Sequence, residues 1–272
     1  MHSNSHATQR VSALVDGSLM SLDLPASNAF VTGMKQRWGD ACVPMTPAYW
    51  AAQTWMWELD APDHFRLGRT LAEELLACML GGHGIPAEVG LAAYRRLRHV
   101  MHSSPEAMHD RASVYAFLAE PLDVGGRAIR YRFAAQKADY ISAAFSQLTE
   151  LDGDGPDLDL RDDLMKLRGV GPKTASWVLR NLRGSNAVAI LDIHILRAGA
   201  ALNIFEHHHR VERHYRQMEE AYLGFAKAIS AKASILDSVI WMTMRQLPEV
   251  RAERLGRPAS PAIAVQQHAL SL

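Results

Sequence analysis

Two side chains with complementary chemistry, Lys173 and Asp192, lie 19 positions apart in the sequence. A neutral lysine amine is a nucleophile that attacks carbon, and a carboxylate beside it accepts a proton or stabilises positive charge. Asp192 by itself fits a helix N-cap, a role that is compatible with catalysis. Lys173 by itself fits a solvated surface lysine, but an ammonium at the start of a helix is electrostatically unfavourable. The pair therefore indicates covalent catalysis by an amine.

The residues just before this lysine, Leu167–Pro172, predict a compact turn. Gly169 and Gly171, which flank Val170, permit positive φ angles and leave backbone N–H groups uncovered, so a phosphate oxygen can approach them. We expect the turn to need both glycines for this approach of a phosphate. Pro172 suits the first position of a helix, because its fixed φ matches the helix and its missing N–H is no loss there. The turn is thus predicted to bind a phosphate backbone.

Apolar residues with helical spacing lie on both sides of the turn and predict a helix-hairpin-helix. These stripes are Leu160, Leu164 and Leu167 before the turn, and Ala175, Val178, Leu179 and Leu182 after it. A helical pair of this kind can also be a packed unit that binds no nucleic acid. Basic side chains around the hairpin favour phosphate binding, and they are Arg161, Lys166, Arg168, Lys173, Arg180 and Arg183. The acidic run from Glu150 to Asp159 is expected to form a solvated linker.

The sequence Leu167-Arg168-Gly169-Val170-Gly171-Pro172-Lys173-Thr174-Ala175, followed by Leu191-Asp192-Ile193-His194 and Arg197, resembles the helix-hairpin-helix Gly/Pro-Asp (HhH-GPD) superfamily of DNA glycosylases. Within that superfamily it is most similar to the compact 8-oxoguanine DNA glycosylase/lyases, especially the archaeal second type. The resemblance implies an all-α, two-lobed fold with the active cleft between the helical lobes. The strong part spans about Arg161 to Arg197, and weaker similarity covers Tyr131–Ile141 and Leu236–Trp241.

The resemblance also implies a reaction. The amine of Lys173 would attack the sugar C1′ of a flipped-out nucleotide and form a Schiff base, and β-elimination would then cut the strand. Asp192 would assist deprotonation of the lysine and offset positive charge on the sugar. No metal or organic cofactor is implied, and a monovalent cation at the hairpin remains open.

Cysteine content separates this chain from other branches of the superfamily. Cys42 and Cys78 are the only two cysteines in the sequence. This number excludes the four-cysteine iron-sulfur cluster that endonuclease III and the adenine glycosylases usually hold. The presence of Lys173 argues against the alkylbase and adenine branches, which generally use water instead. Two cysteines in a chain of this size indicate reduced thiols.

Three side chains are predicted to line the pocket for the flipped base. Trp177 lies one helical turn after Lys173 on the same helix face, so its ring could stack on a purine, although a tryptophan is also an ordinary core residue. Asp237 and Trp241 share a face of the last predicted helix and would form the opposite wall. Stacking alone does not distinguish oxidised guanine from guanine, so the choice of 8-oxoguanine rests on the resemblance.

Further contacts to DNA are predicted outside this pocket. His194 matches a histidine that contacts a phosphate in the resembled family, and Arg197 either reaches a phosphate or pairs with an acidic neighbour. His83 lies at the tip of the glycine-rich turn Gly81–Gly84, which we predict to push a side chain into the gap left by the flipped nucleotide. A plain connection between helices is the alternative for this turn.

The run His207-His208-His209 is assigned to a solvated loop. Three adjacent side chains of a helix do not converge on one ion, and no carboxylate-histidine spacing supports a metal site. No metal ligands are therefore predicted in this chain.

The composition, with 48% hydrophobic and 21% charged residues and zero net charge, is that of a globular protein. We expect an N-terminal extension at 1–45, a helical core at 46–247 with its hairpin at 161–183, and a tail at 248–272. No alternating strand pattern persists. No segment suits a membrane span or a secretory signal. We expect a cytoplasmic monomer with access to nucleoid DNA and double-stranded DNA containing a damaged base as its partner.

Three functions remain open from the sequence. They are a bifunctional glycosylase/lyase for 8-oxoguanine, a glycosylase for another modified base, and a noncatalytic helix-hairpin-helix protein that binds DNA. Lys173 together with Asp192 favours an enzyme, because a protein that only binds DNA needs neither a nucleophile nor a carboxylate at this separation.

Overall fold

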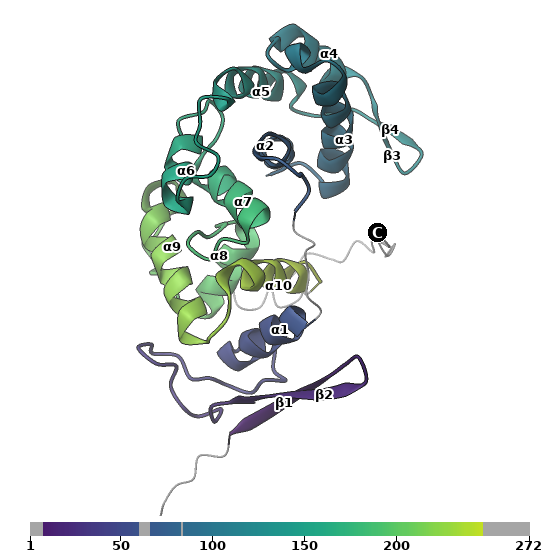
Figure 1. The fold of residues 1–272 in the computed structure, drawn as a ribbon. Coiled ribbons are helices and arrows are strands. Elements are labelled where there is room, and N and C mark those ends of the chain that lie inside the picture. Colours follow the sequence, from purple (N-terminus) through teal and green to yellow (C-terminus); the bar gives the residue numbers. More distant parts are fainter. Residues whose placement is uncertain (1–7, 60–65, 83, 247–272) are drawn as a thin grey trace, which may run out of the picture.

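The computed structural model describes residues 8–59, 66–82 and 84–246, and this part of the chain is mainly helical. The helices gather in two lobes, each with its own hydrophobic core (Figure 1). The first lobe contains α2 (Leu71–Leu80), α3 (Ala87–Ser103), α4 (Arg111–Ala119), α5 (Ala134–Leu148), α6 (Asp157–Leu164) and α7 (Pro172–Arg183). The second lobe contains α1 (Pro47–Leu59), α8 (Ile193–Ala201), α9 (Val211–Ala228) and α10 (Ala233–Gln246). The predicted all-α, two-lobed fold is confirmed.

The chain passes from the first core to the second between two adjacent buried residues. Val188 packs in the first core, and Ala189 packs in the second. The helical pair α6 and α7 lies on the first side of this boundary and α8 lies on the second. Lys173 and Asp192 therefore belong to different lobes, although they are close in sequence.

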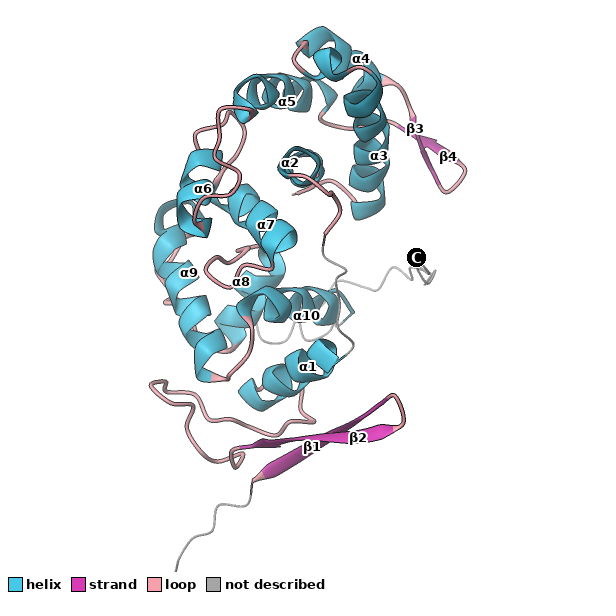
Figure 2. Cartoon of the chain, in the orientation of Figure 1, coloured by secondary structure: helices cyan, strands magenta, loops and turns pink. Residues whose placement is uncertain are grey.

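Two short antiparallel pairs of strands accompany the helices (Figure 2). They are β1 (Gln9–Val15) with β2 (Ser18–Leu24), and β3 (Leu122–Val124) with β4 (Arg127–Ile129). The expectation that no strand pattern persists was wrong here. In β1 every second residue is half-buried, and the two strands are joined by Asp16 and Gly17, both with positive φ. An Asp-Gly pair between alternating residues is a strong hairpin signal.

Residues from the end of β2 and from the segment between β2 and α1 contribute to the second core. Leu24, Val31, Trp38 and Met45 are all buried in the same cluster as residues of α8, α9 and α10. Burial of large apolar side chains stabilises the fold by about 1.5–3 kcal/mol for each residue. In the described part of the chain, the residues expected to form an N-terminal extension are thus packed against the second lobe. The division into extension, core and tail stays a prediction.

Buried ion pairs connect the two lobes, and we call Arg161, Arg180, Glu219 and Asp237 the polar seam. Arg161 of α6 donates to Glu219 of α9 at 2.7 Å, and both side chains are almost fully buried. Arg180 of α7 lies 3.6 Å from Asp237 of α10. Breaking a buried pair leaves an uncompensated charge in an apolar environment, so such pairs hold their elements in one relative position.

The seam corrects one expectation about the basic residues around the hairpin. Arg161 and Arg180 are buried between the lobes, and Arg183 pairs with Asp157 at 2.8 Å and with the carbonyl oxygen of Gly155 at 2.7 Å. These three side chains are engaged inside the protein and do not form an exposed phosphate-binding surface. Asp157, in turn, begins α6 and is not part of a solvated linker.

Candidate active site

The hairpin between α6 and α7 has the predicted helices and packing. Leu160, Leu164 and Leu167 are buried on one side, and Ala175, Val178 and Leu179 on the other. Gly169 has a φ of 84°, and a Cβ atom at this position would collide with the ring of Tyr140. Only glycine satisfies both conditions.

Gly171 differs from Gly169, which corrects the expectation that both glycines are needed for the turn. It is the N-cap of α7 with φ −95° and ψ 176°, an extended conformation that any residue adopts. A Cβ atom there would meet no atom within 4 Å. Glycine at this position leaves open space beside the first N–H groups of α7. These groups have no partner within the helix. These groups suit an anion.

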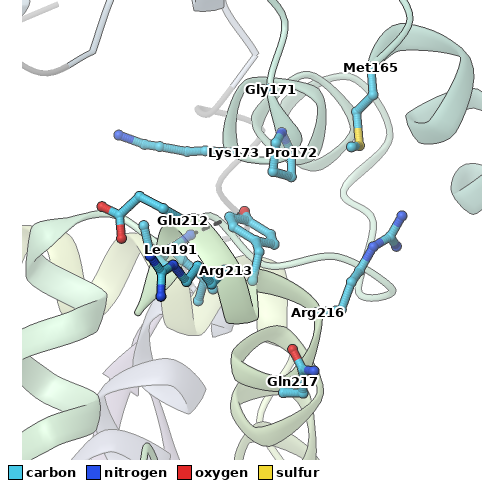
Figure 3. A pocket seen from close by; sticks show the side chains of 11 residues that line it. Met165, Gly171, Pro172, Lys173, Leu191, Glu212, Arg213, Arg216 and Gln217 are labelled. Atoms are coloured by element: carbon cyan, nitrogen blue, oxygen red, sulfur yellow. Dashed lines mark hydrogen bonds between the residues drawn. The ribbon is translucent and has the colours of Figure 1, made fainter. Parts of the chain in front are cut away.

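Lys173 lies in the first turn of α7, directly after Pro172, and its side chain is half-buried. It lines a cavity of about 560 Å³ together with Gly171, Leu191 and residues at the start of α9. Figure 3 shows Lys173 and Pro172 on one side of this cavity and Arg213, Arg216 and Gln217 on the other. Both lobes therefore contribute to the cavity that Lys173 lines.

Asp192 is the N-cap of α8. Its Oδ1 accepts the backbone N–H groups of His194 and Ile195 at 2.8 and 2.9 Å. Both bonds fall on one oxygen, so Oδ2 remains for other interactions. The predicted capping role is thus present in the structure.

Side chains of α9 hold the segment before Asp192 in place. The hydroxyl of Tyr215 donates to the carbonyl oxygen of Ala189 at 2.6 Å, and Glu219 accepts the N–H of Ala189 at 2.9 Å. Tyr215 and Glu219 are both buried. These bonds determine where Asp192 lies relative to the rest of the second lobe.

The pKa of Asp237 depends on burial and on the charged groups around it. Burial raises the pKa of its carboxyl to about 6, against the lowering effect of Arg180. The charge of Asp192 raises this pKa further, and the charge of Lys173 lowers it. Lys173 from α7 and Asp192 at α8 therefore act on one buried carboxyl of α10. The two residues separated by 19 positions share an electrostatic neighbourhood.

The residues predicted to read the base do not line the cavity at Lys173. Trp177 is half-buried and packs closely on the end of α2, since a Cβ atom at Gly81 would lie 2.9 Å from its Cη2. Asp237 is only 5% exposed. Trp241 is half-buried, and its ring meets the ring of His194 edge-on at 6.1 Å. Their roles toward a base stay predictions.

The other residues predicted to contact DNA are His194, Arg197 and His83. His194 and Arg197 are both half-buried on α8. His83 lies outside the described residues. The contacts predicted for these side chains stay predictions as well.

Two features near the site were not found from the sequence. Lys137 in α5 donates to the carbonyl oxygen of Met79 at the end of α2, and its pKa is lowered by burial and by the charge of Lys173. Glu212 and Arg213 of α9 line the cavity opposite Lys173. Sequence patterns carry no signal for these neighbours, because they come from segments far apart in the chain that only packing brings together.

A hairpin that carries a first-turn lysine where two helical lobes meet is the arrangement of the helix-hairpin-helix Gly/Pro-Asp DNA glycosylases. The structure of a trapped endonuclease III–DNA covalent intermediate matches this fold with a TM-score of 0.52, over 71% of this chain and 81% of that one at 21% identity. A family model described as 8-oxoguanine DNA glycosylase matches residues 69–231. The chain belongs to the 8-oxoguanine DNA glycosylase family.

Two individual proteins are similar to parts of this chain. A Metallosphaera sedula protein described as 8-oxoguanine DNA glycosylase/AP lyase is 30% identical over 116 residues, which are 41% of this chain and 57% of that relative. The alignment thus spans little more than half of the relative. The crystal structure of Methanocaldococcus jannaschii 8-oxoguanine DNA glycosylase is 26% identical over 64% of this chain and 77% of that chain, with a TM-score of 0.49.

Among the described helices, none has the length and apolar content that a membrane crossing requires.

Proposed function

We propose that this protein is a DNA glycosylase with AP lyase activity that removes 8-oxoguanine from double-stranded DNA. The observation that carries the proposal is that Lys173, in the first turn of α7, lines a cavity beside the hairpin, while Asp192 begins α8 in the other lobe. Membership of the 8-oxoguanine DNA glycosylase family supports the choice of lesion. We further propose that the protein acts as a monomer in the cytoplasm, on the DNA of the nucleoid.

Binding begins with the phosphate backbone. The uncovered N–H groups at the start of α7 would hold a phosphate next to the damaged nucleotide, while the helix dipole favours the negative charge. His194 and Arg197 would add contacts on α8, and the turn that contains His83 would fill the gap in the stack. The flipped base would lie between Trp177 and the face of α10 that carries Trp241. The proposal also allows a monovalent cation at the hairpin.

The chemistry follows from one amine and one carboxylate. Asp192 takes a proton from the Lys173 ammonium, and Nζ then attacks C1′ while the glycosidic bond breaks and the base leaves with its electron pair. The departing base takes a proton from the attached nitrogen. When the sugar ring opens to a protonated Schiff base, Asp192 passes the proton that it accepted to O4′, and the restored carboxylate offsets the positive charge of the Schiff base. Loss of a C2′ proton to water then expels the 3′ phosphate and cuts the strand. These steps need no metal or organic cofactor.

Borohydride trapping tests the proposal on an end-labelled duplex with one 8-oxoguanine. Borohydride reduces the Schiff base and links the enzyme covalently to DNA. We expect an adduct with the wild type, its loss in Lys173→Gln, and no adduct on undamaged duplex. Lys232→Gln is the matched control, because Lys232 is an exposed lysine just before α10 that pairs with Glu58.

Other outcomes separate the alternatives. An adduct on abasic DNA but not on 8-oxoguanine DNA would indicate a lyase with another base preference. Binding without an adduct or cleavage on either substrate would indicate a protein that only binds DNA. Equal trapping by Lys173→Gln would refute the assigned nucleophile.

A further inference from the structure

The loop between α8 and α9 brings three metal-binding side chains together. One ligand atom from each of Glu206, His208 and His209 lies within 4.8 Å of the other two. A turn produces this arrangement, since the N–H of His209 donates to the carbonyl oxygen of Glu206 at 3.0 Å. The prediction that no metal ligands are present assumed that the three histidines lie on a helix. The structure places these residues in a loop, where their side chains can converge.

The cluster is held in place by its surroundings. Nδ1 of His208 lies 3.3 Å from a carboxylate oxygen of Glu206, and the rings of His208 and His209 are 4.6 Å apart. His214 packs against both rings and accepts the backbone N–H of Arg210 at 3.0 Å. The exposed side chains of Glu206 and His208 need only small rotations to approach one ion.

One ring nitrogen in the cluster lacks a partner. Nδ1 of His209 is buried and has no hydrogen bond to any of the described residues. Buried polar atoms are nearly always satisfied, so such an atom calls for a ligand. The guanidinium of Arg210 is close, but it donates to the carbonyl oxygens of His207 and His209. Glu206 supplies a negative charge that offsets this cation.

We propose that Glu206, His208 and His209 form a binding site for a divalent transition metal ion of the zinc type. One carboxylate and two imidazoles are a donor set that Zn²⁺ prefers, with bonds of about 2.0–2.2 Å. Three protein ligands leave a fourth position in a tetrahedral ion for water or another ligand. The ion forms bonds to the two histidines and the carboxylate and takes no part in base excision.

The metal site adjoins the wall of the candidate active site. A second cavity of about 350 Å³ is lined by Glu206 and His209, and it shares Val211 and Glu212 with the cavity at Lys173. An ion bound by the loop would connect the end of α8 with the start of α9. The site would therefore stabilise the segment that faces the nucleophile.

Zinc binding to the full chain, with any purification tag removed, tests this proposal. We expect isothermal titration calorimetry to give one Zn²⁺ per chain for the wild type. His208→Ala and His209→Ala should each weaken binding by at least about a hundredfold, because loss of a ligand costs no less than loss of an outer-shell partner. His207→Ala is the matched control, because His207 is the adjacent exposed histidine outside the cluster, and its affinity should equal that of the wild type.

Two results would overturn the proposal. One is the absence of stoichiometric Zn²⁺ binding to the wild type, and the other is a loss of affinity in His207→Ala equal to that in His208→Ala and His209→Ala. Circular dichroism verifies that the variants are folded. Should either cluster variant unfold, X-ray absorption of the zinc-loaded wild type decides the question independently. Two imidazoles with oxygen donors support the site, whereas sulfur donors or fewer than two imidazoles contradict it.

Discussion

At the residue scale, Asp192 has two separable tasks. It caps α8 through Oδ1, and we propose that it also assists Lys173. An asparagine keeps an oxygen that can cap the helix but lacks the negative charge. The two tasks therefore respond differently to substitution.

We expect Asp192→Asn to keep the stability of the wild type and to lower the single-turnover excision rate by about 10²–10⁴-fold. Asp192→Ala should show a similar loss of rate and should also lower the free energy of unfolding by about 1 kcal/mol, because the cap is lost. Excision assays and urea denaturation measure the two effects. An Asp192→Asn enzyme with the full rate would remove this residue from the mechanism.

Asp237 gives the stability of the protein a pH dependence. Burial raises its pKa to about 6, whereas an aspartate in an unfolded chain titrates near about 3.9. The folded state therefore binds more protons between these values, and the free energy of unfolding falls as pH rises through this window. The difference between about 3.9 and about 6 corresponds to a decrease in the free energy of unfolding on the order of 3 kcal/mol.

Asp237→Asn lacks this titration, so its stability relative to the wild type should increase from pH 4 to pH 7. Urea unfolding at several pH values measures the difference. Asp159→Asn, which makes the same substitution at an exposed position of α6, serves as the control. A constant difference between Asp237→Asn and the wild type would contradict the raised pKa.

At the element scale, the two glycines of the hairpin have different roles. The position of Gly169 requires a positive φ and leaves no room for a side chain beside Tyr140. Neither constraint applies at Gly171. One position is required by the turn. The other leaves room at the start of α7.

We expect Gly169→Ala to lower the free energy of unfolding by about 1–3 kcal/mol, through backbone strain and the collision with Tyr140. Gly171→Ala should unfold like the wild type but bind duplex DNA more weakly, since the methyl group restricts access to the N–H groups. Denaturant unfolding and fluorescence anisotropy measure the two properties. Equal DNA affinity for Gly171→Ala and the wild type would place phosphate binding elsewhere.

The sequence predicted these elements to different extents. The hairpin helices were found because Leu160, Leu164 and Leu167 carry a helical period that one core satisfies. The strands β1 and β2 were missed although Asp16-Gly17 signalled their turn. The convergence of Glu206 with His208 and His209 depends on a loop conformation, which side-chain periodicity does not encode.

At the scale of the whole molecule, the polar seam determines how the lobes are placed. Lys173 and Asp192 lie on opposite sides of the boundary at Val188, so their separation depends on that placement. The seam could not be predicted from the sequence, because Arg161 and Glu219 are 58 positions apart and each resembles an ordinary surface charge. Only the packed structure shows that both are buried.

Arg161→Met should lower the free energy of unfolding by about 3–5 kcal/mol, because it removes the buried cation that pairs with Glu219. We expect the borohydride adduct to decrease in this variant even at temperatures where the helical circular dichroism signal is intact. Arg10→Met removes an exposed pair with Asp23 and should change neither property. A folded Arg161→Met protein that traps DNA like the wild type would show that the seam does not govern the site.

The seam also bears on how this protein could be recombined with its relatives. Apolar surfaces tolerate substitution as long as volume is kept, whereas a buried ion pair requires its exact counterpart. A chimera joined at Val188 would place an arginine from one parent against the residue that the other parent happens to supply. The lobes are therefore inherited as a matched set, and a lobe exchange should succeed only when the seam residues on both sides come from the same parent.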